Sequence, residues 1–437
     1  MPTPPVRLRS VLAMLLFPLC AWCDPPAAAQ ESVLNAFPRL SAEGDWPWWR
    51  GPSRDGHALA ANPPLTFGEK GNVRWKIPVP GRGHSSPIVV GERVYLTTAD
   101  ESRQLQKVMA FDRQTGAMVW ETVVSEGGFP ANNHPKNTEA SPTLASDGEK
   151  LFVTFFHHER IQLSFLGLDG MILLQKDLMR FHPQKYEYGY APSPIVYGPS
   201  VIVIGEYDGE SFLMAVDRQS GELRWKTPRP VNVSFSSPVV ARLAGKDQLL
   251  ISGANRVSAY DPATGKMLWE VPGTTNATCG TLVWDGDLVF ASGGYPKAET
   301  LAVKADGTGQ VLWRNNQKCY EQSMVTHRGY LYALTDKGIL FCWRGVDGRE
   351  MWQERLRGPV SASPVLIEDR IYWANELGTF YVFRATPERF ELIAENQLGD
   401  EAFASPAVAG QQLFLRVAAN RDELRQEYLY CIAASAP

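Results

Sequence analysis

Side chains that could bind an acidic or sugar-like ligand stand in front of a short Ser-Pro marker that recurs along the chain. The stretches at the marker, or at its expected position, read PGRGHSSP, HPKNTEASP, YEYGYAPSP, NATCGT and CYEQSM. Their candidate ligand-binding residues are Arg82, His84, Asn137, Glu139, Tyr190, Asn276, Tyr320 and Glu321. Charged, imidazole and phenol groups that converge on one mouth can hold a ligand by ion pairing and hydrogen bonds. The alternative is that these groups bond to one another and plug the space between the loops.

Motifs of the common catalytic and metal sites are missing from the sequence. It contains no Gly-x-Ser-x-Gly elbow, phosphate-binding loop or HExxH stretch, and no spacing indicates a carboxylate pair for glycoside cleavage. His157 and His158 are consecutive, and neighbours on a strand face opposite ways, so one strand cannot aim both imidazoles at one metal. We therefore predict no catalytic residue and no metal site.

The cysteines and the charge balance narrow the function classes further. Beyond residue 29 the cysteines are Cys279, Cys319, Cys342 and Cys431, and because none forms a CxxC pair, zinc is not indicated. Cys279 and Cys319 precede neighbouring marker positions, so a disulfide between them is one expectation and four buried thiols are the other.

The net charge is −4, from 43 basic and 47 acidic residues without a basic block, so we expect no nucleic-acid partner.

The first 29 residues have the pattern of a secretory signal peptide. The basic start MPTPPVRLRS is followed by the apolar run VLAMLLFPLCA and by small residues, which predicts cleavage after Ala29. The apolar run is too short to span a bilayer. Cys20 and Cys23 would permit a lipid anchor, but FPL and CAW in front of them are poor lipobox matches. We therefore expect a secreted or periplasmic protein, with a membrane-associated lipoprotein as the alternative.

A second recurring phrase indicates which elements position the Ser-Pro loops. DRQTGAMVW, DRQSGELRW and DPATGKMLW keep Asp, Thr or Ser, Gly and Trp at fixed offsets, and degenerate copies follow. Asp can accept backbone N–H groups, Gly supplies the positive φ of a tight hairpin, and Trp on the outer strand can bury its ring against the next unit. The predicted blade-docking residues are Trp75, Trp120, Trp225, Trp269, Trp313 and Trp352.

Both markers repeat at roughly 40 to 55 residues, and each unit contains four short strands, which predicts an all-β, eight-bladed propeller of four-stranded antiparallel blades. The last unit has three strands, whereas GNVRWKI has no earlier partner. We therefore expect residues 72–77 to lie beside 428–433 and close the ring. The predicted organisation is a signal peptide (1–29), an aromatic leader (30–70) and the propeller (71–437). The leader tryptophans are expected to pack across a blade end, or otherwise to form a partner-binding patch.

The phrase AxDxxTGxxxW resembles the repeat of the pyrroloquinoline quinone (PQQ) propellers, whose dehydrogenases have eight blades. It is also similar to the repeat of BamB-like outer-membrane assembly propellers. The resemblance covers residues 71–437, and the leader WPWWRGPSRDG resembles the start of exported PQQ-like propellers of planctomycete-type bacteria. The repeat describes how blades dock and touches no substrate, so it implies the fold and leaves the chemistry open.

The resemblance also implies what a quinone enzyme would need. In that family the flat cofactor is stacked between a Trp and a disulfide of adjacent cysteines, and Glu and Asn hold calcium beside a catalytic Asp. This chain has no adjacent cysteine pair, no CxxCH and no long insertions. We therefore expect a monomeric binding or assembly module with an envelope-protein or glycan partner at the channel mouth. A PQQ- and calcium-dependent oxidoreductase and a polysaccharide-binding propeller are the alternatives.

Overall fold

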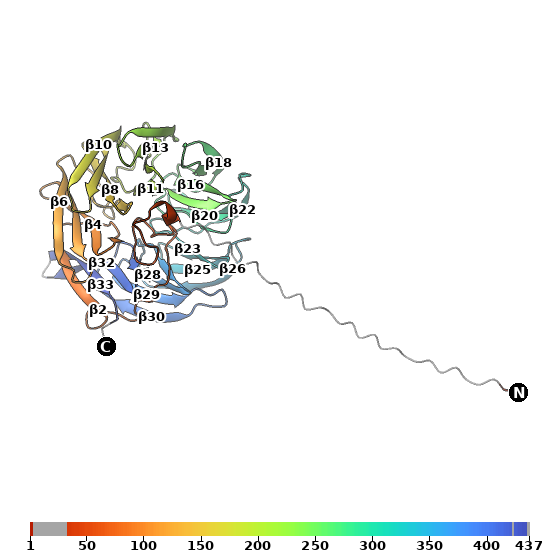
Figure 1. The fold of residues 1–437 in the computed structure, drawn as a ribbon. Helices are drawn as coiled ribbons and strands as arrows, with labels where there is room; N and C mark the ends of the chain where they lie inside the picture. Colours follow the sequence, from red (N-terminus) through yellow and green to blue (C-terminus); the bar gives the residue numbers. More distant parts are fainter. Residues whose placement is uncertain (3–32, 422–423, 435–437) are drawn as a thin grey trace. The chain divides into compact units, whose positions relative to one another are not determined.

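The computed structural model describes residues 1–2, 33–421 and 424–434 (Figure 1). The expected signal peptide, residues 1–29, therefore lies almost wholly outside the described residues. The described chain begins its fold with a short 3-10 helix, η1 (Val33–Ala36). Within the described ranges, no helix combines the length and the apolar character that crossing a membrane would require.

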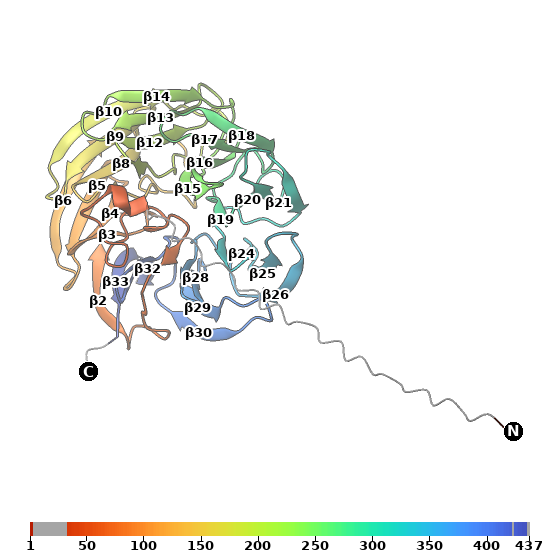
Figure 2. The same cartoon turned by 45° about the vertical axis from the view of Figure 1, so that its right-hand side comes forward.

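Eight antiparallel sheets follow one another around a central axis, which confirms the predicted eight-bladed propeller (Figures 1 and 2). We number the blades in chain order. The strands of blades 1 to 4, from the axis outward, are β3 (Ile88–Val90), β4 (Arg93–Asp100), β5 (Leu105–Asp112) and β6 (Met118–Glu126); β7 (Ala145–Ser146), β8 (Lys150–His157), β9 (Arg160–Gly167) and β10 (Ile172–Arg180); β11 (Ile195–Tyr197), β12 (Ser200–Gly205), β13 (Phe212–Asp217) and β14 (Leu223–Pro228); and β15 (Val239–Leu243), β16 (Lys246–Gly253), β17 (Arg256–Tyr260) and β18 (Met267–Pro272).

The other four blades follow the same order. Their strands are β19 (Val283–Asp285), β20 (Leu288–Gly293), β21 (Glu299–Lys304) and β22 (Val311–Asn315); β23 (Val325–His327), β24 (Tyr330–Leu334), β25 (Ile339–Arg344) and β26 (Glu350–Arg355); β27 (Val365–Ile367), β28 (Arg370–Ala374), β29 (Thr379–Arg384) and β30 (Leu392–Gln397); and β31 (Ala407–Ala409), β32 (Gln412–Arg421), β33 (Leu424–Ile432) and β2 (Val73–Val79). The middle strands of each blade are buried on both faces, because each sheet is covered by its neighbours.

Ring closure occurs as the sequence predicts. The N-terminal strand β2 pairs antiparallel with β33, with Trp75 opposite Cys431 and Ile77 opposite Leu429. The last blade thus takes its outermost strand from the start of the propeller. This pairing leaves no open sheet edge between the two ends of the ring.

The recurring Trp and Gly make the contact between neighbouring blades. Trp75 of blade 8 donates its Nε1–H to the carbonyl of Arg113 in blade 1 at 3.0 Å, and a Cβ on Gly116 would lie 2.8 Å from the Trp75 ring. Trp225 of blade 3 contacts Gly265 of blade 4 in the same way. The glycine of this phrase is therefore required for two reasons. Its backbone has a positive φ, and the neighbouring tryptophan ring occupies the space that a Cβ would fill.

The same indole-to-carbonyl contact joins other blades, with two departures. The indole groups of three further tryptophans donate to carbonyls of the next blade; these are Trp120, Trp313 and Trp352. Trp269 donates instead to Gln248 in its own blade. In blade 2, Leu174 takes the place of the tryptophan and lies against Gly221 of blade 3.

The middle of the aromatic leader lies at the centre of the ring, whereas its residues 65–67 lie against β30, the outermost strand of blade 7 (Figures 1 and 2). Trp46 forms an antiparallel bridge with Val89 of blade 1, and the Arg50 guanidinium donates to the Pro364 carbonyl of blade 7. Trp46 and Trp48 are both buried, so they form no exposed patch. The leader also adds a short parallel strand, β1 (His57–Ala58), inside β27, which makes the sheet of blade 7 five-stranded. The sequence analysis did not predict this strand.

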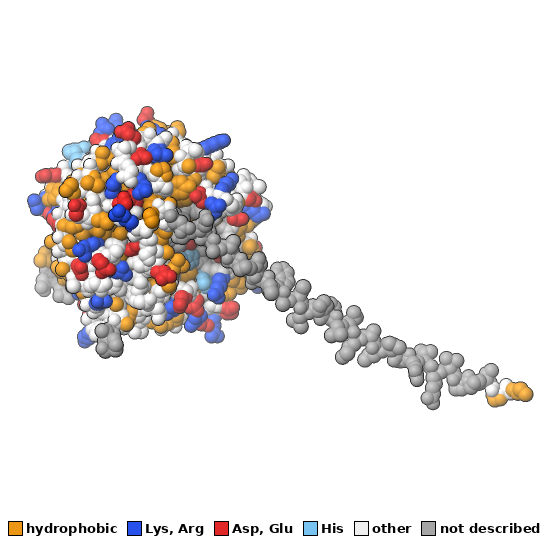
Figure 3. All heavy atoms as spheres, viewed as in Figure 1, with side chains coloured by type: hydrophobic (Ala, Val, Ile, Leu, Met, Phe, Trp, Pro, Cys, Tyr) orange, Lys and Arg blue, Asp and Glu red, His pale blue; other side chains and the backbone are white. Residues whose placement is uncertain are grey.

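Figure 3 shows one face of the molecule, on which basic and acidic side chains are interspersed among apolar ones. Several apolar side chains of outer strands are exposed, among them Met118 and Val119 on β6. The neighbouring blade covers the outer strands only in part, so some of their side chains are exposed.

Candidate functional site

A ring of hydroxyl groups surrounds the axis where the loops enter the innermost strands. At six of the ring's eight positions in the described chain, the backbone N–H of one ring residue donates to the hydroxyl oxygen of the ring residue in the next blade. This link is made from Ser86 to Thr143 at 3.0 Å and from Ser193 to Ser237 at 2.9 Å. From Ser237 to Thr281, the Thr281 hydroxyl donates to the Ser237 carbonyl instead. We call these positions the hydroxyl ring: Ser86, Thr143, Ser193, Ser237, Thr281, Ser323, Ser363 and Ser405. The Ser of the Ser-Pro marker is thus a link between blades, a role that the sequence analysis missed.

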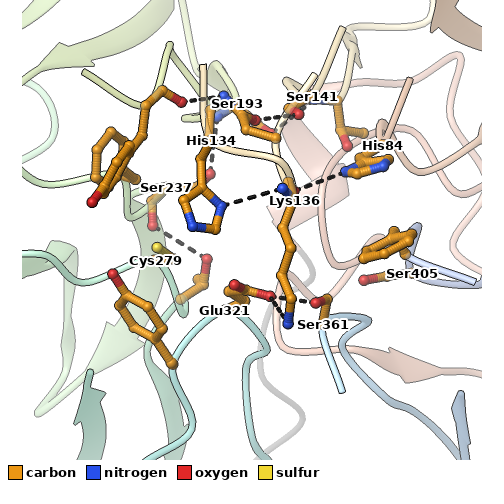
Figure 4. A pocket seen from close by; sticks show the side chains of 18 of the residues that line it. His84, His134, Lys136, Ser141, Ser193, Ser237, Cys279, Glu321, Ser361 and Ser405 are labelled. Carbon is orange, nitrogen blue, oxygen red and sulfur yellow. Dashed lines mark hydrogen bonds and ion pairs between the residues drawn. The ribbon is translucent and has the colours of Figure 1, made fainter. Parts of the chain in front are cut away.

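A pocket opens on the axis beside the hydroxyl ring, and loops from all eight blades contribute to it (Figure 4). It leaves about 160 Å³ in which a water molecule can be centred, or about 950 Å³ with the solvent at its mouth included. Trp49 of the leader lines it and donates its Nε1–H to the Thr281 hydroxyl at 2.9 Å. The leader therefore supplies part of the pocket wall, and the arrangement has the concave form of a ligand site.

Lys136 crosses the pocket and joins opposite sides of the propeller (Figure 4). It comes from the long connection between β6 and β7, residues 127–144. Its Nζ lies 2.6 Å from Glu376 Oε1 in blade 7 and 3.7 Å from Glu321 Oε2 at the entrance to blade 6. Burial disfavours the ammonium, but the Glu376 hydrogen bond and the nearby carboxylates outweigh it and raise the pKa of Lys136.

Ser361 connects the two carboxyl groups that face Lys136. Its hydroxyl contacts Glu321 Oε2 and lies 2.6 Å from Glu376 Oε1. A hydroxyl has one hydrogen, so the two contacts either share it as a bifurcated hydrogen bond or include one carboxyl group that carries a proton. Burial raises the pKa of Glu321, which favours that group as the proton carrier. Lys136 therefore faces two carboxyl groups and compensates part of their charge.

Two imidazoles present opposite hydrogen-bonding groups. His84 stacks on Phe403, with ring centroids 4.5 Å apart and planes at 8°. Its Nδ1 lies 3.1 Å from the Lys136 carbonyl and must therefore carry the hydrogen, so the buried Nε2, which has no partner in the described residues, is an acceptor. Burial, together with Arg82 and other nearby cations, lowers the pKa of His84 well below 6.5, so the ring is neutral.

His134 has the other tautomer. Its Nδ1 accepts the backbone N–H of Lys136 at 3.2 Å, so Nε2 carries the hydrogen and is a donor. Burial and the Lys136 charge lower the pKa of His134. The ring packs edge-on against Tyr188, with centroids 4.8 Å apart. The pocket therefore offers both donors and acceptors beside flat apolar surfaces.

The structure brings four of the predicted ligand-binding residues into the pocket and leaves four outside it. The pocket residues are His84, Asn137, Tyr320 and Glu321. Of the others, Tyr190 is buried and donates its hydroxyl to the Ile204 carbonyl at 2.8 Å. Arg82 donates to the Pro135 carbonyl and pairs with Glu101. The remaining two are bonded locally: Glu139 accepts from Asn133 and Asn276 accepts from Asn232 and Asn255.

Several pocket residues were not candidates in the sequence analysis. They are Trp49, His134, Lys136, Phe235, Ser361 and Phe403. Tyr188 also lines the pocket and stands beside Tyr190 in YEYGYAPSP, one of the stretches selected from the sequence. His134 and Lys136 stand in HPKNTEASP, the stretch from which only Asn137 and Glu139 were chosen. The length of the connection in front of β7 was the available signal, because a long loop at the channel mouth can reach across it.

The sequence left a disulfide or buried thiols open for Cys279 and Cys319, and in this structure both residues are free thiols. Cys319 is buried in the core between blades 5 and 6, and its Sγ contacts the Leu334 carbonyl at 3.4 Å. Cys279 lines the central pocket instead. Burial raises the pKa of both thiols, so neither is a reactive thiolate at neutral pH.

The pocket residues do not fit PQQ and calcium in the arrangement that the resemblance implied. The pocket has a single thiol, Cys279, where the quinone enzymes have a disulfide of adjacent cysteines. In the described ranges, no three His, Cys, Asp or Glu side chains are grouped as metal ligands. The pocket carboxylates Glu321 and Glu376 are bonded to Lys136 and Ser361. We derive no redox step through such a cofactor.

Comparison with known proteins gives consistent matches. Residues 65–155, 106–306 and 297–389 match the family model described as "Outer membrane protein assembly factor BamB". The chain is 25% identical over 345 residues to the protein of that name from Burkholderia pseudomallei, covering 70% of this chain and 85% of the relative. Among solved structures it is similar to BamB from Moraxella catarrhalis (15% identity, TM-score 0.59, 82% of this chain and 99% of that one). It is also similar to a europium-containing methanol dehydrogenase (12% identity, TM-score 0.63, 89% and 98%). These two structural likenesses concern the fold alone.

Proposed function

The chain belongs to the propeller family described as outer membrane protein assembly factor BamB, and from this premise we propose that it is an envelope binding or assembly module whose ligand or partner enters the axial pocket. The observation that carries the proposal is the pocket itself, which receives side chains from the loops of all eight blades. His84 Nε2, which has no partner among the described residues, is an acceptor that a ligand in this space could use.

The proposed setting is the bacterial envelope. The names of the relatives concern outer membrane protein assembly, so a protein of the envelope is the proposed partner. Export through the signal peptide at residues 1–29 belongs to this proposal, with a lipid anchor as its alternative. The likeness of the leader to exported propellers of planctomycete-type bacteria stays a prediction from the sequence.

The two alternative functions differ in their support. A PQQ-dependent oxidoreductase would need a cofactor wall that the single pocket thiol Cys279 does not supply. A polysaccharide-binding propeller would use the same pocket, whose aromatic rings and hydroxyls can also contact a sugar. A polysaccharide ligand is therefore an outcome of the experiments below.

Photocrosslinking in cells tests where the partner binds. A photoreactive phenylalanine analogue would replace Tyr320, which lines the pocket, and in a matched variant Met267, which is exposed on β18. We expect crosslinked products from position 320 and none from 267. Products from 267 alone would show that the partner binds the outer strands and would refute the pocket as the binding site.

A further inference from the structure

Four members of the hydroxyl ring have a hydrogen left for a ligand. Thr143, Ser193, Ser237 and Ser405 line the pocket, and each hydroxyl oxygen accepts the N–H of the preceding blade. Within the described residues, none of these four hydroxyls donates to an acceptor. Because a hydroxyl supplies one hydrogen as well as lone pairs, the links between blades occupy the oxygens and leave the hydrogens available.

The other members of the ring do not contribute in this way. The Thr281 hydroxyl already donates to the Ser237 carbonyl and accepts the indole of Trp49. Ser323 and Ser363 make the same backbone link as their neighbours but do not line the pocket. The ring hydrogens that a ligand in the pocket could reach are therefore those of Thr143, Ser193, Ser237 and Ser405.

Two buried cations lie on the leader next to this ring. The Arg50 guanidinium, 3% exposed, donates to the carbonyls of Pro364 and Met324. Arg54, 2% exposed, donates to the Val196 carbonyl. In the described part of the chain, neither guanidinium forms an ion pair with a carboxylate. Burial lowers the pKa of Arg50 to about 10 and that of Arg54 to about 9, which shows the cost of holding these charges away from water.

Arg54 is close to the pocket. It lines a small hollow together with Trp48, Trp49 and Ser193, and the last two of these also line the pocket. The nearest carboxylate on the leader, Asp55, is paired with His57 at 2.6 Å. The carboxylate charges that act on Arg54 and Arg50 are those of Asp247 and Asp55, and within the described residues neither forms an ion pair with the guanidinium. The two cations therefore still favour an anion in the adjoining space, because the field is weakly screened away from water.

We propose that the pocket binds a small aromatic organic anion, whose carboxylate oxygens accept from Ser193 and Ser237 of the hydroxyl ring in the field of Arg54. Its flat apolar part lies against the aromatic walls, which comprise Tyr188, Phe235, Tyr320 and the stacked rings of His84 and Phe403. On the opposite wall the Lys136 ammonium lies next to Glu376 and Glu321 and offsets part of their charge. This inference rests on the proposed function, because it names the ligand class of the same pocket.

Titration with defined probes tests the ligand class. Benzoate and 2-naphthoate represent the aromatic carboxylates, inorganic phosphate a small anion without an apolar part, and methyl glucoside a neutral hydroxyl-rich ligand. Binding to the full mature chain is measured by calorimetry. We expect the aromatic carboxylates to bind and the other two probes not to compete with them.

Matched serine variants test the geometry. Ser237→Ala and Ser363→Ala each remove one hydroxyl that accepts a backbone N–H of the preceding blade, but only Ser237 lines the pocket. Because a hydrogen bond to a charged group contributes substantially to binding, we expect Ser237→Ala to lower the affinity about tenfold or more. Ser363→Ala should stay within about twofold of the unmodified chain, and unfolding midpoints of both variants identify any general loss of folding.

The outcomes separate this inference from the proposed function. Binding of methyl glucoside or of phosphate without the aromatic carboxylates would overturn the anion class and leave the pocket as the binding site. Equal losses in both serine variants would overturn the role of the ring hydrogens. No binding of any probe, with crosslinking from position 320 retained, would overturn this inference alone. Loss of that crosslinking as well would remove both.

Discussion

Replacement of Trp75 by alanine is expected to weaken the closure of the ring. Trp75 is 8% exposed, its ring lies 5.9 Å from that of Phe414, and it also packs against Gly116 of blade 1. Truncation of a buried aromatic side chain to alanine costs about 3–5 kcal/mol. This loss includes about 1 kcal/mol for the indole hydrogen bond to the Arg113 carbonyl. Since whole domains are stable by about 5–15 kcal/mol, the expected loss is a large fraction of the total.

The assay is equilibrium unfolding in guanidinium chloride, with the free energy of unfolding extrapolated to water. The matched control is Trp352→Ala, because Trp352 makes the same indole contact with the Thr386 carbonyl but is less buried. We expect a smaller loss in this control. A loss below about 1 kcal/mol in Trp75→Ala would refute the reasoning that the closing strand is held by this ring.

Further predictions concern titration, thiols and the cofactor. Burial raises the pKa of Glu139 to about 7, so the folded chain binds its proton more tightly than the unfolded chain. The free energy of unfolding should therefore fall as pH rises from 4.5 to 7, and Glu139→Gln should remove this fall; an unchanged profile contradicts it. Alkylation of the denatured, unreduced chain should label Cys279 and Cys319, whereas a cross-linked peptide would contradict their free state. Addition of PQQ and calcium should give no dye-linked alcohol oxidation, and sustained dye reduction would contradict the fit of the pocket.

Blade docking could be predicted from the sequence because its parts repeat at fixed offsets. The hairpin glycine and the outer-strand tryptophan belong to one repeated motif. The tryptophan of one motif packs against the glycine of the next, as Trp225 packs against Gly265. The pairing that closes the ring could be predicted from the number of strands. The last unit has three strands and the first strand has no earlier partner, so the two ends must pair. The indole N–H groups donate to backbone carbonyls, which every residue has. Residue type therefore does not indicate which carbonyl accepts, and these hydrogen bonds could not be predicted.

The pocket could be predicted only in part. His84 and Glu321 were found because they stand directly before marker positions. Lys136 was missed because its partners, Glu376 and Glu321, are far away in sequence and reach it only across the axis. Tyr190 stands in an equivalent stretch, yet it turns into the core and bonds the Ile204 carbonyl. Residue type and position place a side chain at the mouth, whereas the loop conformation decides where it points.

The chain by itself determined the number of blades, the strand order and the closing pair, because these depend on periodic patterns of apolar residues, turns and tryptophans. Only the tertiary structure decided what occupies the axis. Eight loops and the leader all reach this small volume. Packing and the hydrogen bonds of buried polar groups decide which of their side chains fill it. The leader therefore lies inside the ring, Lys136 spans the pocket, and the ring hydroxyls keep hydrogens for a ligand.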